Sequence, residues 1–313
     1  MITALAPAVC RDALAQDVAA LPVARRLLHA GDFEVYCASA TELPHAMLEI
    51  ARLREWAFRA VGEGTGLALD TDRFDQTYHH LFVWHRSSQA ILGAYRLGFT
   101  APIAAAEGVA GLYTHSLFEF DASLLAHTGA CIELGRSFVH PEWQGSSRVL
   151  RLLWGGIAVV LDQHPEVKRL FGPVSISPDY SDNARSLLLN ALQRHHMDPV
   201  LQQLVQPRHP PQWGSPHGKS SQWTRLTSVL AGLGELAALT KCLQEAAPDL
   251  GLPMLIKHYL GLQGRFAAFN MDAAFNNTLD GLVFVQVQNI SPTLRRKLTG
   301  TPNTQAATAL AVA

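Results

Sequence analysis

Apolar and polar residues follow two different periods along this chain. Residues 33–38 alternate as a half-buried strand does. Further strands are predicted at residues 80–86, 90–97, 131–139, 169–177, 265–269 and 282–287. A 3.6-residue period predicts helices over residues 41–60, 147–163, 183–195 and 234–247, the first of them N-capped by Thr41. An early hairpin followed by strand–helix–strand units predicts an α/β (α+β) class around one mixed sheet.

The same pattern divides the chain into three parts. Residues 1–32 are Ala-rich and weakly patterned, so we expect a flexible arm with a short helix. Residues 33–290 hold every predicted strand and form one domain, and residues 291–313 remain as a C-terminal tail. The Gly-rich residues 62–66 predict a flexible loop, because they follow no strand and lack the Lys-Ser/Thr ending of a phosphate loop. Residues 206–219 are rich in Pro and Gly and predict a lid or a boundary.

Composition narrows the class of protein. Hydrophobic residues make up 48% and charged residues 16% of the chain, which is typical of a globular protein. A net charge of −1 gives no overall basic field, so no nucleic-acid partner is expected. Four widely spaced cysteines and the lack of an 18-residue apolar run favour a cytoplasmic location. The pairs His79-His80 and His195-His196 lack the spacing of metal ligands, so we expect no metal.

Residues 131–139 carry the first candidate for chemistry. Glu133 lies in an otherwise apolar strand, where a carboxylate is costly unless it is paired or functional. Strand alternation places Glu133 and Gly135 on one face and Leu134 and Arg136 on the other. A structural ion pair between Glu133 and Arg96 of the neighbouring strand would also account for this residue.

A loop and a helix start follow this strand. The backbone N–H groups of Gly145, Ser146 and Ser147 would point at one place, which is an arrangement that binds anions. Ordinary N-capping of the helix by Ser146 or Ser147 explains the same residues equally well.

A strand with an acidic motif, then a Gln-Gly-Ser-Ser loop that opens a helix, resembles the acyl-donor site of the GNAT acyltransferase superfamily. The resemblance spans about residues 33–290 and is closest to a branch of ornithine-lipid-forming N-acyltransferases and proteins often labelled hemolysins. The order of Arg, Asp-x-x-Asp, Arg-Leu and Glu-x-x-Arg is also similar to acyl-homoserine lactone synthases. The blocks that carry it are residues 49–66, Asp72-Arg-Phe-Asp75 with His80-Leu81, Gly93-Ala-Tyr-Arg-Leu97, Glu133-Leu-Gly-Arg-Ser-Phe-Val139, Leu153-Trp-Gly-Gly-Ile157, Phe171-Gly-Pro-Val-Ser-Ile-Ser177 and Phe275-Asn-Asn-Thr-Leu-Asp-Gly-Leu282.

The resemblance implies a GNAT-like fold and a reaction. A long-chain acyl group, 3-hydroxylated or plain, would pass from acyl carrier protein to the α-amine of ornithine, giving a lyso-ornithine lipid. The donor's own phosphopantetheine would serve as the cofactor, with CoA as another possible carrier, and the product would meet the inner-membrane surface. Two alternatives stay open: acylation of glycine, lysine, glutamine or a signal precursor, and a non-catalytic acyl-binding or hemolysin-like protein.

The resemblance also assigns roles in the site. Glu133 would accept a proton from the amine, with Arg136 beside it, because amide formation needs a neutral nucleophile. Backbone N–H groups near Phe138 and Val139 would hold the thioester carbonyl. The phosphopantetheine phosphate would bind at Gln144, Gly145, Ser146, Ser147 and Arg148.

The remaining roles concern the amine and the acyl chain. Asp72 and Asp75 would shape the amine pocket or close the neighbouring loop. Three arginines would pair with these acids or bind the substrate carboxylate, with roles left undivided: Arg54, Arg96 and Arg136. An apolar tunnel would use some of the helix residues Leu152, Leu153, Trp154 and Ile157, which ordinary core packing also explains.

Overall fold

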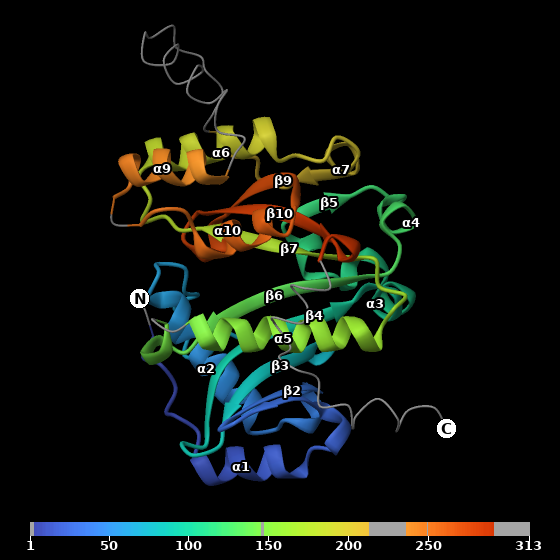
Figure 1. The fold of residues 1–313 in the computed structure, drawn as a ribbon, viewed down its shortest axis with the longest axis vertical. Helices are drawn as coiled ribbons and strands as arrows, with labels where there is room; N and C mark the ends of the chain where they lie inside the picture. The colour runs from blue at the N-terminus through green and yellow to red at the C-terminus, as the bar shows by residue number, and fades with distance from the viewer. Residues whose placement is uncertain (1–2, 145–146, 213–235, 249, 291–313) are drawn as a thin grey trace, which may run out of the picture.

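The computed structural model describes residues 3–144, 147–212, 236–248 and 250–290, and an eight-stranded sheet runs through them (Figure 1). β6 and β7 pair in parallel and the other neighbours pair antiparallel, so the predicted mixed α/β sheet is confirmed. In order across the sheet the strands are β1 Arg26–Ala30, β2 Phe33–Ser39, β3 His79–His85, β4 Ala90–Phe99, β6 Cys131–Val139, β7 Arg169–Ile176, β10 Thr278–Gln286 and β9 Arg265–Asp272.

Helices cover both faces of this sheet. They are α1 Arg11–Ala20, α2 Ala46–Arg59, α3 Thr100–Glu107, α4 Leu124–Thr128, α5 Ser147–Gln163, α6 Asp182–His195, α7 Leu201–Leu204, α9 Leu236–Ala246 and α10 Met254–Gly261. A separate two-stranded sheet joins β5 Phe118–Phe120 to β8 Val205–Pro207. Within the described residues, no helix is both long enough and apolar enough to cross a bilayer.

The predicted strands and helices are present, and the strand over 131–139 and the helix over 147–163 have the predicted bounds. The N-terminal region departs from the prediction in part. A flexible arm with a short helix was expected over residues 1–32. The short helix is present as α1, whereas residues 26–30 form β1, which pairs along β2 at the edge of the sheet. The limits of the domain at residues 32 and 290 stay predictions.

The start of α2 is a second correction. The helix begins at Ala46 rather than after Thr41, because its N-terminus is capped from α1. The carboxylate of Asp17, 5% exposed, accepts the backbone N–H groups of His45 and Ala46, each at 2.7 Å. These N–H groups have no partner within the helix, so a cap distant in sequence decides where α2 begins.

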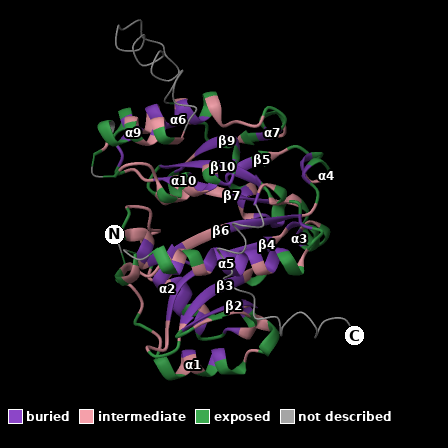
Figure 2. Cartoon of the chain, viewed as in Figure 1, coloured by how far each residue is buried: buried purple, intermediate pink, exposed green. Residues whose placement is uncertain are grey.

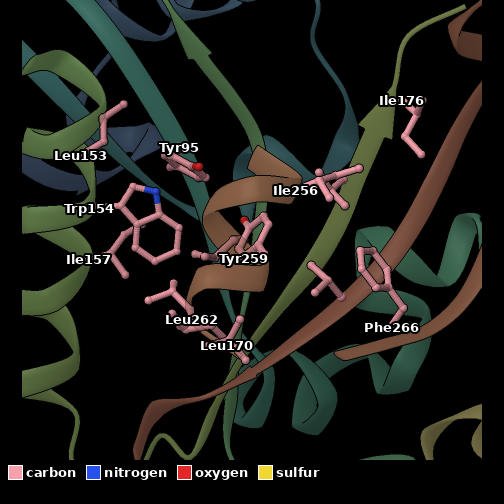
Figure 3. Packing of buried hydrophobic residues seen from close by; sticks show 14 of the residues in the cluster. Tyr95, Leu153, Trp154, Ile157, Leu170, Ile176, Ile256, Tyr259, Leu262 and Phe266 are labelled. Atoms are coloured by element: carbon pink, nitrogen blue, oxygen red, sulfur yellow. The ribbon is translucent and has the colours of Figure 1, made fainter. Parts of the chain in front are cut away.

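Buried residues gather along the central strands and the facing sides of α2 and α5 (Figure 2). α5 lies on the face opposite α2, and Gly156 lets it approach the sheet closely. A Cβ at this position would lie 2.7 Å from Val35 and 2.8 Å from Leu81. Beside α5, α10 inserts Tyr259 against Trp154, with ring centroids 5.8 Å apart, and Tyr95 lies 6.3 Å from Trp154 (Figure 3).

The sheet opens between β6 and β7. The two strands pair only from Cys131 to Glu133 on β6, opposite Arg169 to Phe171 on β7. A Cβ at Gly172 would overlap the carbonyl oxygen of Leu134, so the strands touch closely here before they separate. Beyond this point no strand among the described residues pairs with the edge of β6 that faces β7.

A bulge in β6 corrects the predicted face of Arg136. Ala94 lies opposite Phe138 and Arg96 opposite Gly135, so β6 holds one extra residue, and Arg136 has a φ of 49°. Strand alternation fails at the bulge. Arg136 and Arg96 consequently bind the same carboxylate, that of Asp72, from the same side of the sheet.

The cap of α2 gives a test of this packing. Asp17→Ala leaves the backbone N–H groups of His45 and Ala46 without this acceptor, so we expect the free energy of unfolding to fall by about 1–2 kcal/mol. Asp12→Ala, on the exposed side of the same helix, is the matched control and should change it by less than ~0.5 kcal/mol. Urea unfolding followed by circular dichroism measures both, and equal values for the two variants would contradict the capping role.

Candidate functional site

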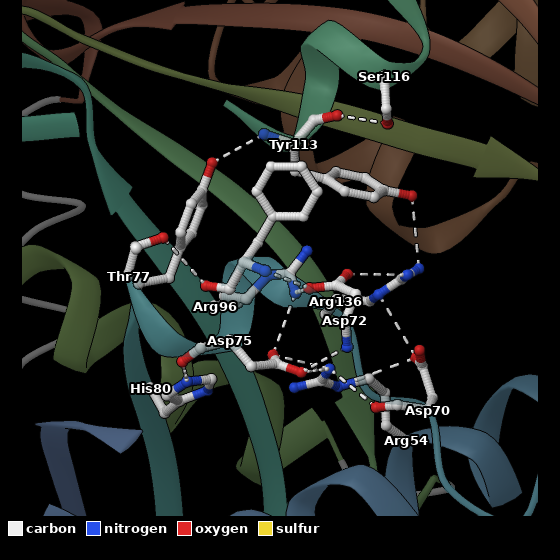
Figure 4. A network of polar contacts seen from close by, with 12 residues as sticks. Arg54, Asp70, Asp72, Asp75, Thr77, His80, Arg96, Tyr113, Ser116 and Arg136 are labelled. Atoms are coloured by element: carbon white, nitrogen blue, oxygen red, sulfur yellow. Dashed lines mark hydrogen bonds and ion pairs between the residues drawn. The ribbon is translucent and has the colours of Figure 1, made fainter. Parts of the chain in front are cut away.

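Three arginines and three aspartates form a closed ring of alternating charge beside the bulge (Figure 4). The nitrogen–oxygen distances around the ring run Arg54–Asp75 3.1 Å, Asp75–Arg96 3.1 Å, Arg96–Asp72 2.5 Å, Asp72–Arg136 3.3 Å, Arg136–Asp70 3.4 Å and Asp70–Arg54 4.0 Å. We call these six residues the charge ring. The arginines therefore pair with the acids, which is one of the two roles that the sequence left open.

The charge ring joins four segments that are distant in sequence. Arg54 comes from α2, Arg96 from β4 and Arg136 from β6, while residues 70–75 supply the acids. The side chains of Arg54 and Arg96 are each 1% exposed, so their charges depend on these partners. Burial raises the pKa of Asp75, but Arg54 and Arg96 outweigh it and lower this pKa to about 2.

Glu133 lies next to the ring and is 1% exposed. Its carboxylate accepts the N–H of Thr114 at 2.6 Å, the N–H of Tyr113 at 3.2 Å and the hydroxyl of Tyr78. Burial raises the pKa of Glu133, while the bonds from Tyr78 and Thr114 act in the opposite direction. Arg96, the alternative partner considered from the sequence, binds Asp72 and Asp75 instead.

A cavity of about 240 Å³ lies where β6 and β7 separate. Its polar lining includes Arg136 and Ser137 of β6 and Ser175 of β7. Apolar walls come from Phe58, Phe275 and Pro173 and from the start of α10 at Pro253, Met254 and Leu255. The predicted wall residues Leu153, Trp154 and Ile157 are instead buried in the core under α5.

Three acids in the cavity were not predicted: Glu63, Asp272 and Asp280. Asp280 lies in the middle of β10, is 4% exposed and accepts the hydroxyl of Ser175 at 2.8 Å. Burial, followed by the charge of Asp272, raises the pKa of Asp280 to about 7. Burial, followed by Asp280 and Asp179, raises the pKa of Glu63 to about 8.

The Gly-rich loop at residues 62–66 is held in place, in contrast to the flexible loop that we predicted. Glu55, 0% exposed, accepts the N–H and hydroxyl of Thr65 and the N–H of Gly66. Asn276 donates to the carbonyl of Gly62 at 3.1 Å. These contacts fix Glu63 at the cavity.

The predicted donor loop is described in part. Phe138 and Val139 pair with β4, and the side chain of Gln144 is exposed. Ser147 begins α5, and the guanidinium of Arg148 lies 4.0 Å from the ring centroid of Phe33. Gly145 and Ser146, like residues 213–219 of the Pro-rich segment and the C-terminal tail, lie outside the described residues. The roles of this loop stay predictions.

The sequence led to the ring but not to the cavity. Arg54, Asp72, Asp75, Arg96 and Arg136 were all singled out and lie together. Asp70 was missed, although it stands two residues before Asp72 in the same acidic motif. Asp280 was missed despite the signal that marked Glu133, an acid within an apolar strand.

Comparison with known proteins agrees with this architecture. Residues 53–155 match the model of the acetyltransferase (GNAT) domain. A glycine N(alpha)-acyltransferase of Bacteroides thetaiotaomicron is 37% identical over 196 residues, which are 59% of this chain and 58% of that protein. The glycine N(alpha)-acyltransferase of Phocaeicola vulgatus is also 37% identical, over 53% of this chain and 54% of that protein. The chain thus spans little more than half the length of these two relatives.

Further matches cover more of the chain. The match to a solved CoA-dependent acyl-homoserine lactone synthase covers 84% of this chain and 86% of the synthase chain, with 12% sequence identity and a TM-score of 0.38. An L-ornithine N(alpha)-acyltransferase of Rhodobacter capsulatus is 30% identical over 233 residues, which are 71% of this chain and 76% of that protein. The chain belongs to the GNAT acyltransferase family that contains these amino-acid Nα-acyltransferases.

Proposed function

We propose that this protein transfers a long-chain acyl group from acyl carrier protein to the α-amine of an amino acid, with ornithine as the acceptor. The observation that carries the proposal is the charged cavity at the opening of the sheet, where one guanidinium and three carboxylates face one space. An amino acid carries both charges that such a lining would bind. The product, a lyso-ornithine lipid, leaves for the inner-membrane surface.

The opening also suits the acyl donor. Beyond Glu133 the edge of β6 that faces β7 has no strand partner in the part of the chain that the structure describes, so backbone N–H groups near Phe138 and Val139 can hold the thioester carbonyl. α5 begins at Ser147, after the loop that follows this strand, and its N-terminus favours the phosphopantetheine phosphate near Gln144, Ser147 and Arg148. The acyl chain extends from the thioester along the apolar walls of the cavity.

Glycine is the second candidate acceptor. The relatives named for glycine are 37% identical to this chain over their matched regions, against 30% for the relative named for ornithine. The two acceptors differ by one positive charge, so competition between them separates the candidates directly.

The direct test is acyl transfer with purified protein. We expect hydroxyacyl or plain acyl carrier protein, mixed with equal concentrations of ornithine and glycine, to yield mainly N-acylornithine by mass spectrometry. N-acylglycine as the main product would select the second candidate. Free thiol without any acyl amide would contradict N-acyl transfer to both acceptors.

Glu133 has a positioning role in this proposal. Its carboxylate accepts the backbone N–H groups of Tyr113 and Thr114 and so holds Tyr113 in place. The aromatic ring of Tyr113 lies 4.9 Å from Cζ of Arg136 and orients this arginine. We expect Glu133→Gln to raise KM for the amino acid by about tenfold, since roughly 1.4 kcal/mol of binding is lost. The pH dependence of turnover should persist. A fall of ~100-fold in kcat with the pH dependence abolished would identify Glu133 as the general base instead.

The carrier protein is tested by reversing charge on α5. Arg148 and Arg151 are exposed on the first turns of this helix, next to the predicted donor loop. We expect Arg148→Glu with Arg151→Glu to raise KM for acyl carrier protein and to reduce the salt dependence of kcat/KM, because such charges act on encounter. Arg194→Glu on α6 is the control of equal charge change. If acyl-CoA works equally well and the double variant behaves as the control, the carrier-protein donor is wrong.

A further inference from the structure

The cavity holds more carboxyl groups than its one arginine can pair with. The charge ring is neutral, since three arginines meet three aspartates, and Arg136 is part of it. Glu63, Asp272 and Asp280 come in addition to these six residues. Free glycine is a zwitterion without net charge, whereas ornithine carries one more positive charge. A cation that binds beside these acids favours their ionised form, so the cavity suits the more cationic ligand.

Arg136 is oriented so that its Nη1 group remains available to a ligand. Its guanidinium lies between the rings of Tyr113 at 4.9 Å and Phe275 at 4.5 Å, and both rings line the cavity. Nε and Nη2 face Asp70 and Asp72. Nη1 has a contact of 3.5 Å with the hydroxyl of Tyr113, at the limit of a hydrogen bond. This group can donate to a carboxylate of the ligand.

The carboxylates offer acceptors with open positions. Asp280 is 4% exposed. One of its carboxylate oxygens accepts a hydrogen bond from the hydroxyl of Ser175, and the other has no hydrogen-bond donor among the described residues. The carboxylate of Glu63 likewise has no donor within the part of the chain that the structure describes. Both carboxyl groups line the cavity, so an ammonium group placed there can donate to these open oxygens.

The charged neighbours set the direction of the ligand. Asp280 lies within the field of Arg136 and Asp272, whereas the charged groups acting on Glu63 are Asp280 and Asp179. In ornithine the α-carboxylate and α-ammonium share one carbon, and the second ammonium lies three methylene groups away. The α-groups therefore belong near Arg136 and Asp280, and the side chain extends toward Glu63.

We infer that the cavity selects a dibasic amino acid, with its α-carboxylate on Arg136, its α-ammonium on Asp280 and its side-chain ammonium on Glu63, and that Asp280 takes the proton from the α-ammonium. This inference rests on the proposed acyl transfer. The carboxylate of Asp280 accepts one proton, and the neutral nitrogen forms a bond to the thioester carbon. The C–S bond then breaks, the nitrogen loses its second proton to the leaving sulfur, and Asp280 returns its proton to solvent.

The electrostatics of the cavity suit this step. Burial and Asp272 raise the pKa of Asp280 to about 7, which is a range in which a carboxylate accepts protons effectively. The groups that face Glu63, Asp272 and Asp280 are Arg136 from β6, Tyr113 with its hydroxyl, Asp179 after β7 and His209. Burial raises the pKa of Asp272, and Arg136 and His209 act in the opposite direction. Since the base works when deprotonated, kcat/KM should rise with pH through about 7.

Two variants separate selection from proton transfer. We expect Glu63→Gln to lower kcat/KM for ornithine by ~10-fold or more and to change kcat/KM for glycine by less than ~3-fold, because only ornithine reaches this residue. Asp280→Asn should lower kcat/KM by roughly 100-fold with either acceptor and remove the rise with pH. Glu166→Gln, at an exposed position after α5, is the control for both.

Thermal unfolding of Asp280→Asn tests whether this variant still folds. The pKa of Asp280 is raised in the folded state, so the charged carboxylate destabilises the fold increasingly as pH rises from the unfolded pKa to about 7. The variant should therefore gain more in Tm over the wild type at pH 8 than at pH 5. Ornithine should raise the Tm of the wild type and of Glu166→Gln more than that of Glu63→Gln.

The outcomes distinguish this inference from the reaction on which it rests. If the wild type acylates no amino acid, the proposed reaction fails. If the wild type acylates ornithine but Glu63→Gln loses both acceptors equally, the assignment of Glu63 to the side-chain ammonium is wrong. If Asp280→Asn keeps the rise of kcat/KM with pH, the proton goes elsewhere.

Discussion

The structure depends on one constraint, the mutual neutralisation of the six charges of the charge ring, four of which are buried. Arg54 and Arg96 are almost fully buried, and such charges are tolerated only with complete partners, because a single unpaired one costs about 3–5 kcal/mol. The three arginines lie on three different elements and the acids on a fourth segment, so the ring forms only when α2, residues 70–75, β4 and the bulge of β6 are in place. The pairing thereby fixes the opening of the sheet, since the same bulge lies beside it.

Local signals in the sequence predict most of the framework. The strand at Cys131–Val139 and the helix at Ser147–Gln163 end where periodicity indicates, because side-chain period is a local property. The errors come from long-range contacts. α2 begins at Ala46 because Asp17 caps it from 28 and 29 residues away, and no local pattern carries that information. Arg136 changes face because β6 holds one extra residue opposite β4, a feature of pairing rather than of alternation.

The candidate site likewise contains residues that local sequence motifs predict and residues that only long-range contacts bring together. Residues of the charge ring stand in short motifs, so pattern and resemblance lead to them. The cavity brings together Glu63 from a loop after α2, Asp272 at the end of β9 and Asp280 within β10, more than 200 residues from Glu63 in the chain. Their proximity follows from the order of strands across the sheet, which places β10 beside β7. Only Asp280 left a trace in the sequence, as an acid among apolar strand residues.

Arg136 belongs both to the charge ring and to the lining of the cavity. The residues that orient its guanidinium are therefore different from the acids that set the charge of the cavity. The ring holds its guanidinium through Asp70 and Asp72 and also neutralises it, while Tyr113 and Phe275 cover its two faces. The net charge that a ligand meets is therefore set by Glu63, Asp272 and Asp280, which take no part in the ring. Because the three acids lie outside the ring, a substitution among them leaves the pairing that shapes the sheet intact. Under the proposed function, such a substitution would alter the preferred charge of the acceptor on the same framework.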